Sequence, residues 1–144
     1  MADVRVFLVI LVLISLTTAL HLQAWRALRH GLRHLAHRPG LATLMMIFSL
    51  VLVHTAEVAL FAVGYGWSIQ WANVGSLAGN LTGGWRDYAY FSASVYTTMG
   101  FGDVVPVGRV RLIAGMESIT GLLMIAWSGS FTYLQMQRLW GKPA

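Results

Sequence analysis

The chain has 144 residues, of which 57% are hydrophobic and only 10% are charged. This composition is too apolar for an ordinary water-soluble domain and indicates a membrane protein. The chain contains no cysteine, which excludes disulfide bonds, and its formal charge is +5.

Three apolar runs are long enough to cross the hydrocarbon core of a bilayer. They extend over residues 4–22, 41–63 and 112–134. At about 1.5 Å per helical residue, each run spans roughly 30 Å or more. The sequence therefore predicts an all-α membrane protein with three transmembrane helices.

The first run allows a second interpretation. Its apolar core is followed by Thr17-Thr18-Ala19, as in some cleaved signal peptides. A retained helix is favoured because the start of the chain, Asp3-Val4-Arg5, lacks a clearly positive region. Cleavage would also place the basic segment that follows on the external side, against the positive-inside rule.

Basic residues set the expected orientation. The segment between the first two runs contains Arg26, Arg29, Arg33 and Arg38, so it is expected on the cytoplasmic side. Residues 64–86 then form an external loop, and the N-terminus lies outside. The helical spacing of Arg26, Arg29 and Arg33 also fits a helix that continues from the membrane or lies on anionic lipid headgroups. A topology signal is the simpler interpretation.

The most informative motif lies just before the third run, at residues 97–103. A dehydrated cation needs many oxygens around it, and successive backbone carbonyl groups can provide them. Gly100 and Gly102 can adopt backbone angles that side chains forbid. We therefore expect inward-facing carbonyl groups from four successive residues, Thr98, Met99, Gly100 and Phe101.

This motif resembles the filter of the potassium-channel pore family, which reads TVGYGD or TIGFGD. The sequence TMGFGD at 98–103 keeps the threonine, both glycines and the aspartate, with Met99 in place of valine or isoleucine. Pro106 also matches a common proline of the family. The resemblance covers about residues 87–133. It implies K⁺ binding at Thr98, Met99, Gly100 and Phe101, with Gly102 completing the filter and Asp103 at its outer mouth.

The resemblance also implies a small bacterial-type channel with one extra N-terminal helix, assembled as a homotetramer in the cell membrane. The implied cargo is K⁺, with no cofactor and no nucleic-acid partner. Two tryptophans that often brace the family's filter are replaced by Tyr90 and Phe91, and Phe101 lacks a hydroxyl. A non-selective monovalent cation channel is therefore an alternative to a potassium channel.

The predicted organisation has two parts. Residues 1–40 form the N-terminal transmembrane helix and the basic connection, and residues 41–138 form a pore domain. The pore domain consists of an outer helix 41–63, an external loop 64–86, a pore helix 87–97, a filter 98–103 and an inner helix 109–138. Asp87 is expected to cap the pore helix. A second VGYG sequence at 63–66 is rejected as a filter because it follows Ala62 and precedes Trp67.

Ionisable residues inside the apolar runs predict a buried polar cluster. His54 and Glu57 lie on one helical face, Glu117 lies in the third run, and such residues usually pair inside the protein. We expect the three to meet and to reach Ser94 or Tyr96, as a structural clamp or as a proton-sensitive brace for gating. A metal site formed by His54 and the two glutamates is the weaker interpretation.

Gly121 of the third run resembles the gating hinge of the family's inner helix, although close helix packing is the safer interpretation. No nucleophile and oxyanion arrangement accompanies the intramembrane residues, so an enzyme is not expected. The alternative from another class is a non-conducting accessory or sensor subunit with a pore-like fold.

Overall fold

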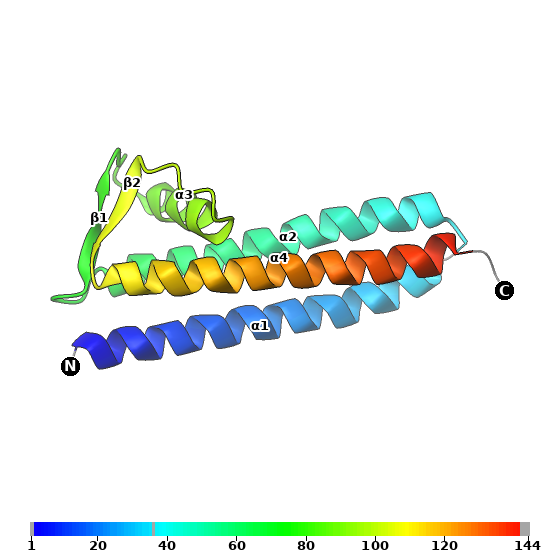
Figure 1. Ribbon diagram of the computed structural model, residues 1–144, viewed down its shortest axis with the longest axis horizontal. Helices are drawn as coiled ribbons and strands as arrows, with labels where there is room; N and C mark the ends of the chain where they lie inside the picture. Colours follow the sequence, from blue (N-terminus) through cyan, green and yellow to red (C-terminus); the bar gives the residue numbers. More distant parts are fainter. Residues whose placement is uncertain (1, 36, 142–144) are drawn as a thin grey trace.

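A computed structural model of the protein describes residues 2–35 and 37–141. Within these residues it has four helices, α1 (Ala2–His34), α2 (Pro39–Ser68), α3 (Trp85–Tyr96) and α4 (Val110–Trp140), and two strands, β1 (Gly75–Gly79) and β2 (Val104–Gly108). The three long helices lie side by side, and α3 sits with the strands at the end that carries the N-terminus (Figure 1). We call this the hairpin end.

The three long helices α1, α2 and α4 are long and apolar enough to cross a membrane. Large apolar side chains stay exposed along them, as expected for surfaces that face lipid. Examples are Phe7 on α1, Leu52 on α2 and Leu123 on α4. The protein is therefore an all-α membrane protein with a short helix against the bundle, as the sequence predicts.

The helices extend beyond the apolar runs. The first helix continues to His34, so Arg26, Arg29 and Arg33 lie on its last turns, whereas Arg38 lies in the connection as the N-cap residue of α2. The second helix starts at Pro39, where a missing N–H costs nothing, and ends at Ser68 instead of residue 63. The VGYG sequence at 63–66 is therefore helical, and Gly64 packs against the Leu13 side chain of α1.

Part of the expected external loop is a strand. Strand β1 pairs antiparallel with β2, with Gly75 opposite Gly108 and Gly79 opposite Val104. Gly75 has a φ of 117°, and a Cβ there would lie 2.0 Å from the Val107 carbonyl oxygen. Only glycine fits so close to the partner strand. The sequence Gly-Ser-Leu-Ala-Gly lacks the alternation that predicts a strand, so the pairing was missed.

The cap of α3 differs from the prediction. The helix starts at Trp85 after Gly84, so Asp87 occupies its third position and is not the N-cap residue. Its carboxylate accepts hydrogen bonds from Thr82 N at 3.1 Å, Thr82 Oγ1 at 2.7 Å and Gly83 N at 2.7 Å. Asp87 thus holds the turn before the helix, as the acidic residue of a capping box does.

Two apolar clusters form the core, one toward the hairpin end and one toward the far end. The first includes Val9 of α1 and Phe61 of α2, and the second includes Met46 of α2 and Phe131 of α4. Several buried polar residues, among them His21, Glu57 and Ser128, lie on the long helices between these clusters. The bundle therefore has a polar layer in its middle, where a membrane offers no water to solvate it.

Candidate functional site

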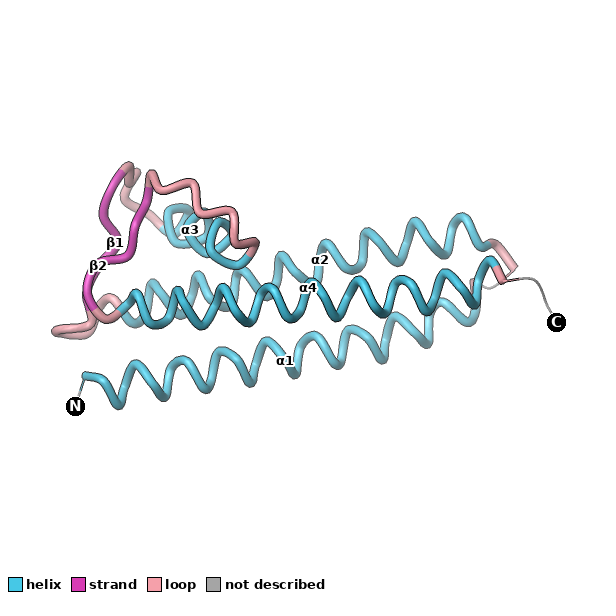
Figure 2. Tube along the Cα trace, viewed as in Figure 1, coloured by secondary structure: helices cyan, strands magenta, loops and turns pink. Residues whose placement is uncertain are grey.

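The TMGFGD segment, residues 98–103, joins α3 to β2 and runs back from the end of α3 toward the hairpin (Figure 2). Its φ angles alternate in sign: Thr98, Gly100 and Gly102 have positive values of 58°, 55° and 82°, whereas Met99 and Phe101 do not. Alternation of this kind turns successive N–H groups to one side. Because each peptide carries its C=O opposite its N–H, the carbonyl groups turn to the other side.

Ser94 of α3 receives these N–H groups. Met99 N and Gly100 N donate to the Ser94 carbonyl oxygen at 3.0 and 3.2 Å, and Phe101 N donates to Ser94 Oγ at 3.3 Å. The carbonyl groups of Thr98, Met99 and Gly100 belong to the same peptides, so they point away from α3. Ser94 therefore holds the TMGFGD segment and does not join the intramembrane acids, which corrects the predicted assignment to the polar cluster.

Tyr90 braces the other end of the segment. Its ring stacks on Phe101 with centroids 6.0 Å apart and an interplanar angle of 8°. Its hydroxyl donates to the two Asp103 carboxylate oxygens at 3.0 and 2.9 Å, and this carboxylate raises the pKa of Tyr90. Phe101 needs no hydroxyl for this contact, because Tyr90 provides both the stacking ring and the hydrogen bond.

His54 and Glu57 lie together in the polar layer, as predicted, but Glu57 also contacts His21 of α1, which the prediction does not include. His54 Nδ1 lies 2.9 Å from one Glu57 carboxylate oxygen, and the Tyr96 hydroxyl donates to that same oxygen. The other oxygen lies 2.7 Å from Nδ1 of His21 on α1. His54 Nε2 in turn lies 3.0 Å from Ser128 Oγ of α4. This cluster joins all four helices.

Glu117 forms a separate cluster, so the predicted single group divides in two. Its carboxylate accepts hydrogen bonds from Ser92 Oγ at 2.5 Å and from the Tyr65 hydroxyl. Helices α2 and α4 run antiparallel. At about 1.5 Å per residue, Ser128 lies about 16 Å farther from the hairpin end along α4 than Glu117 does. Ser128 is therefore the α4 residue at the level of His54.

Gly121 lies where α4 crosses the end of α3. A Cβ on Gly121 would lie 2.2 Å from the Tyr96 carbonyl oxygen, closer than real atoms approach. Helix α4 is continuous through this position. The close approach of the Tyr96 carbonyl explains why a glycine is needed at position 121. The role of Gly121 as a gating hinge stays a prediction.

The sequence also carried a signal for His21 that was overlooked. His21 is the one ionisable residue between Arg5 and Arg26, inside the first apolar run. A lone ionisable residue in a transmembrane run usually faces the protein interior and has a partner. Its buried side chain obeys this rule. Tyr65, Ser92 and Ser128 carried no comparable signal, because hydroxyl residues are common in apolar helices.

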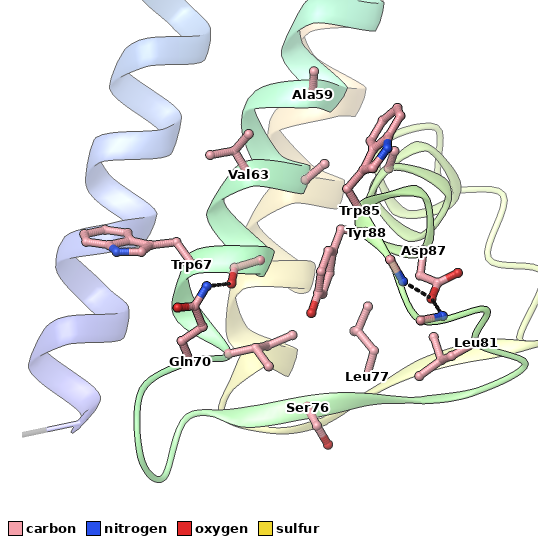
Figure 3. Close-up of a pocket in the computed structure, with 16 residues that line it drawn as sticks. Ala59, Val63, Trp67, Gln70, Ser76, Leu77, Leu81, Trp85, Asp87 and Tyr88 are labelled. Carbon is pink, nitrogen blue, oxygen red and sulfur yellow. Dashed lines mark hydrogen bonds between the residues drawn. The ribbon is translucent and has the colours of Figure 1, made fainter.

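Cavities also lie away from the TMGFGD segment. A cavity of about 960 Å³ lies between α2, β1 and α3, with Val63, Trp67, Leu77 and Tyr88 in its wall (Figure 3). A smaller one of about 290 Å³ lies on α1 near its far end, lined by Leu22, Trp25, Arg26, Arg29, His30 and Arg33. The predicted lipid-binding arginines thus lie on one helical face beside a tryptophan.

The sequence model of a family described as "Ion channel" matches residues 41–136, which is most of the chain. The protein therefore belongs to this ion channel family, and its helices make it an integral membrane protein. The match starts near the beginning of α2, so α1 lies outside it. Membership of the family points to a protein that is not an enzyme. No curated protein and no solved structure matches the chain.

Proposed function

We propose that the protein is a potassium channel that conducts K⁺ passively through the TMGFGD segment. The observation that carries this proposal is the alternating backbone of residues 98–102, with its amide groups held by Ser94. A row of carbonyl groups that points away from the protein's own core can replace the water around a cation. The ion sites lie at Thr98, Met99, Gly100 and Phe101, and Gly102 gives the final turn of the filter.

The functional unit of this proposal is a homotetramer. One chain provides a single row of carbonyl groups, and an ion needs oxygens on all sides, so several copies must surround one axis. The Met99 and Phe101 side chains are 61% and 62% exposed on the single chain, which leaves them available to neighbouring copies. The four copies of Asp103 then form an acidic ring at the outer mouth. The C-terminal ends of the four α3 helices favour a cation at the other end, below the filter.

Selectivity for K⁺ over Na⁺ depends on how firmly the segment is held. The Tyr90 ring and hydroxyl support the segment where the family often has tryptophan.

In this proposal, the hairpin end faces the outside of a bacterial cell and the arginines of α1 face the cytoplasm. Arg26, Arg29 and Arg33 bind anionic lipid headgroups there.

Ion flux from purified protein in liposomes tests the proposal. Wild type is expected to carry K⁺ faster than Na⁺, and Gly100→Ala is expected to abolish flux because alanine disfavours a φ of 55°. Gly83→Ala is the matched control, since Gly83 has a φ of 84° outside the segment. Native mass spectrometry of each variant checks that the assembly stays intact.

Each other outcome selects a different function. Equal K⁺ and Na⁺ flux that is lost in Gly100→Ala would identify a non-selective cation channel. No flux from an intact assembly would contradict conduction and favour the accessory or sensor subunit. Flux that survives Gly100→Ala but is lost in Gly83→Ala would place the ion pathway outside the TMGFGD segment.

A further inference from the structure

Four buried or half-buried side chains from three helices form a closed ring of polar contacts. Glu57 contacts His21 Nδ1 at 2.7 Å and His54 Nδ1 at 2.9 Å through its two carboxylate oxygens. On the opposite side, Ser128 Oγ lies 3.0 Å from His54 Nε2 and 3.4 Å from His21 Nε2. We call these four residues the polar ring. The Tyr96 hydroxyl of α3 contacts the ring at two atoms: it donates to a Glu57 carboxylate oxygen and lies 2.9 Å from His54 Nδ1.

The polar ring needs more hydrogens than its residues ordinarily bring. Its four contacts need four hydrogens, one for each pair of nitrogen and oxygen atoms. Ser128 brings one hydrogen and each neutral histidine brings one, whereas an ionised Glu57 brings none. Three hydrogens would leave two lone pairs facing each other in one contact, inside a protein where an unsatisfied polar group is costly. Tyr96 brings one further hydrogen but also two further contacts, one with Glu57 and one of 2.9 Å with His54 Nδ1, so it does not supply the missing hydrogen.

We propose that the polar ring is a binding site for one proton, beyond those carried by an ionised Glu57 and two neutral histidines. The bound proton completes the fourth contact and makes the ring electrically neutral, which suits its place in the middle of a membrane protein. The proton belongs to the group as a whole, because the count is the same whether it resides on a histidine or on the carboxyl group.

A metal ion fits this ring less well than a proton. Donor atoms of His21, His54 and Glu57 do lie within 4.8 Å of one another. However, the nitrogen–oxygen distances of 2.7 and 2.9 Å are those of hydrogen bonds. A divalent ion opposite one carboxylate would also leave a net positive charge in an apolar region.

The surroundings of the ring favour a single bound proton. Among the described residues, Tyr96 is the one titratable group outside the ring that contacts it. Helix α4 places only the uncharged residues Ser128 and Trp127 against the two histidines. Trp127 stacks on His21 with ring centroids 5.3 Å apart, which keeps water from that side. The His54 side chain is 22% exposed, so this histidine gives the proton a route in and out.

The site connects α1 to the proposed ion pathway. His21 lies on the helix outside the matched ion channel region, and Tyr96 is the last residue of α3, two residues before Thr98. Loss of the proton would weaken one contact that holds α1 against α2 and α4. The proton-binding proposal goes beyond the proposed function and does not require that the protein conduct K⁺.

Nuclear magnetic resonance of the full-length protein in lipid nanodiscs tests the proposal at neutral pH. Imidazole ¹⁵N shifts report which ring nitrogens carry hydrogen, and the carboxyl ¹³C shift of Glu57 reports its ionisation. His21→Asn and His54→Asn assign the signals. We expect three hydrogens in total on the two imidazoles and the Glu57 carboxyl group. A total of two would overturn the proposal, whatever the flux measurements show.

Two serine variants test whether the ring itself holds the proton. Ser128→Ala removes the bridge between the imidazoles, so the total is expected to fall from three to two. Ser130→Ala is the matched control, because its exposed hydroxyl bonds the Ala126 carbonyl of its own helix, and the total should stay at three. An unchanged total in Ser128→Ala would contradict a ring-bound proton. Loss of both Nδ1 hydrogens on addition of Zn²⁺ would instead identify a metal site.

Discussion

His21 Nδ1 lies 2.7 Å from a Glu57 carboxylate oxygen, although the two residues are 36 positions apart. Both side chains are fully buried, and only Glu57 lies in the matched ion channel region. A second contact, between Arg109 Nε and Asp3 Oδ1 at 2.5 Å, joins α1 to the start of α4 at the hairpin end. The extra N-terminal helix is therefore attached to the channel domain by specific polar contacts as well as by apolar packing.

Removal of the His21 side chain should destabilise the protein. His21→Ala leaves one Glu57 oxygen buried without its donor, and we expect a loss of about 1–3 kcal/mol of unfolding free energy. The decrease can be measured as a lower unfolding temperature in detergent. His30→Ala is the control, because His30 is exposed on the same helix. Equal effects of the two substitutions would show that the buried contact does not stabilise α1.

The fold could be predicted well from the sequence because membrane helices leave a strong signal. The runs 4–22, 41–63 and 112–134 each lie inside one observed helix, and the expected membership of an ion channel family is confirmed by the family match at residues 41–136. The predicted pore helix 87–97 and inner helix 109–138 agree with α3 and α4 to within two residues at each end. Helices α1 and α2 extend farther than predicted at their C-terminal ends, because arginine and glycine residues beyond the apolar runs still form helix here. The strand pair was missed because its glycines are selected by close backbone contact, not by periodicity.

The polar layer could be predicted only in part. Helical spacing places His54 and Glu57 on one face of a helix. Which residues of α4 lie opposite them depends on the length of α2 and of the connection to α4, and the sequence alone does not fix this register. That register brings Ser128 to His54 and leaves Glu117 with Tyr65. The contribution of α1 requires packing between distant segments, for which a single sequence contains little information.

Tyr90→Phe should weaken the outer end of the TMGFGD segment while its ring still stacks on Phe101. The substitution removes only hydrogen bonds to an exposed carboxylate, so the unfolding temperature should change little. We expect the ratio of K⁺ to Na⁺ flux to decrease because Asp103 is no longer held. Tyr133→Phe, which removes an exposed hydroxyl near the far end, serves as the control. An unchanged flux ratio would show that this bond does not support selectivity.

The turn before α3 should lose stability in acid because of Asp87. Hydrogen bonds from Thr82, Gly83 and Gly84 lower the pKa of Asp87 from 3.8 to about 2. A lowered pKa means that the folded state favours the ionised form, so this contribution is complete above pH 4 or so and disappears as the pH falls toward 2. Hydrogen-exchange protection of the Gly83 and Gly84 amides should decrease over that range.

Asp87→Asn provides the comparison for the acid effect. The amide keeps the shape of the side chain but cannot ionise, so protection at neutral pH should be lower than in wild type. Between pH 4 and 2 the variant should change little beyond the intrinsic exchange rate. A wild-type profile that matches the variant would contradict the assigned role of the carboxylate.

Gly121→Ala distinguishes close packing from a hinge. The added methyl group would lie 2.2 Å from the Tyr96 carbonyl oxygen, so α4 must move away from the end of α3. Overpacking of this kind typically costs about 1–3 kcal/mol, and a lower unfolding temperature is expected. Gly129→Ala is the control on the same helix, because a Cβ there meets no described atom within 4 Å beyond its own stretch of helix. A hinge without tight packing would instead leave the unfolding temperature of Gly121→Ala equal to that of Gly129→Ala and change only the time that the channel stays open.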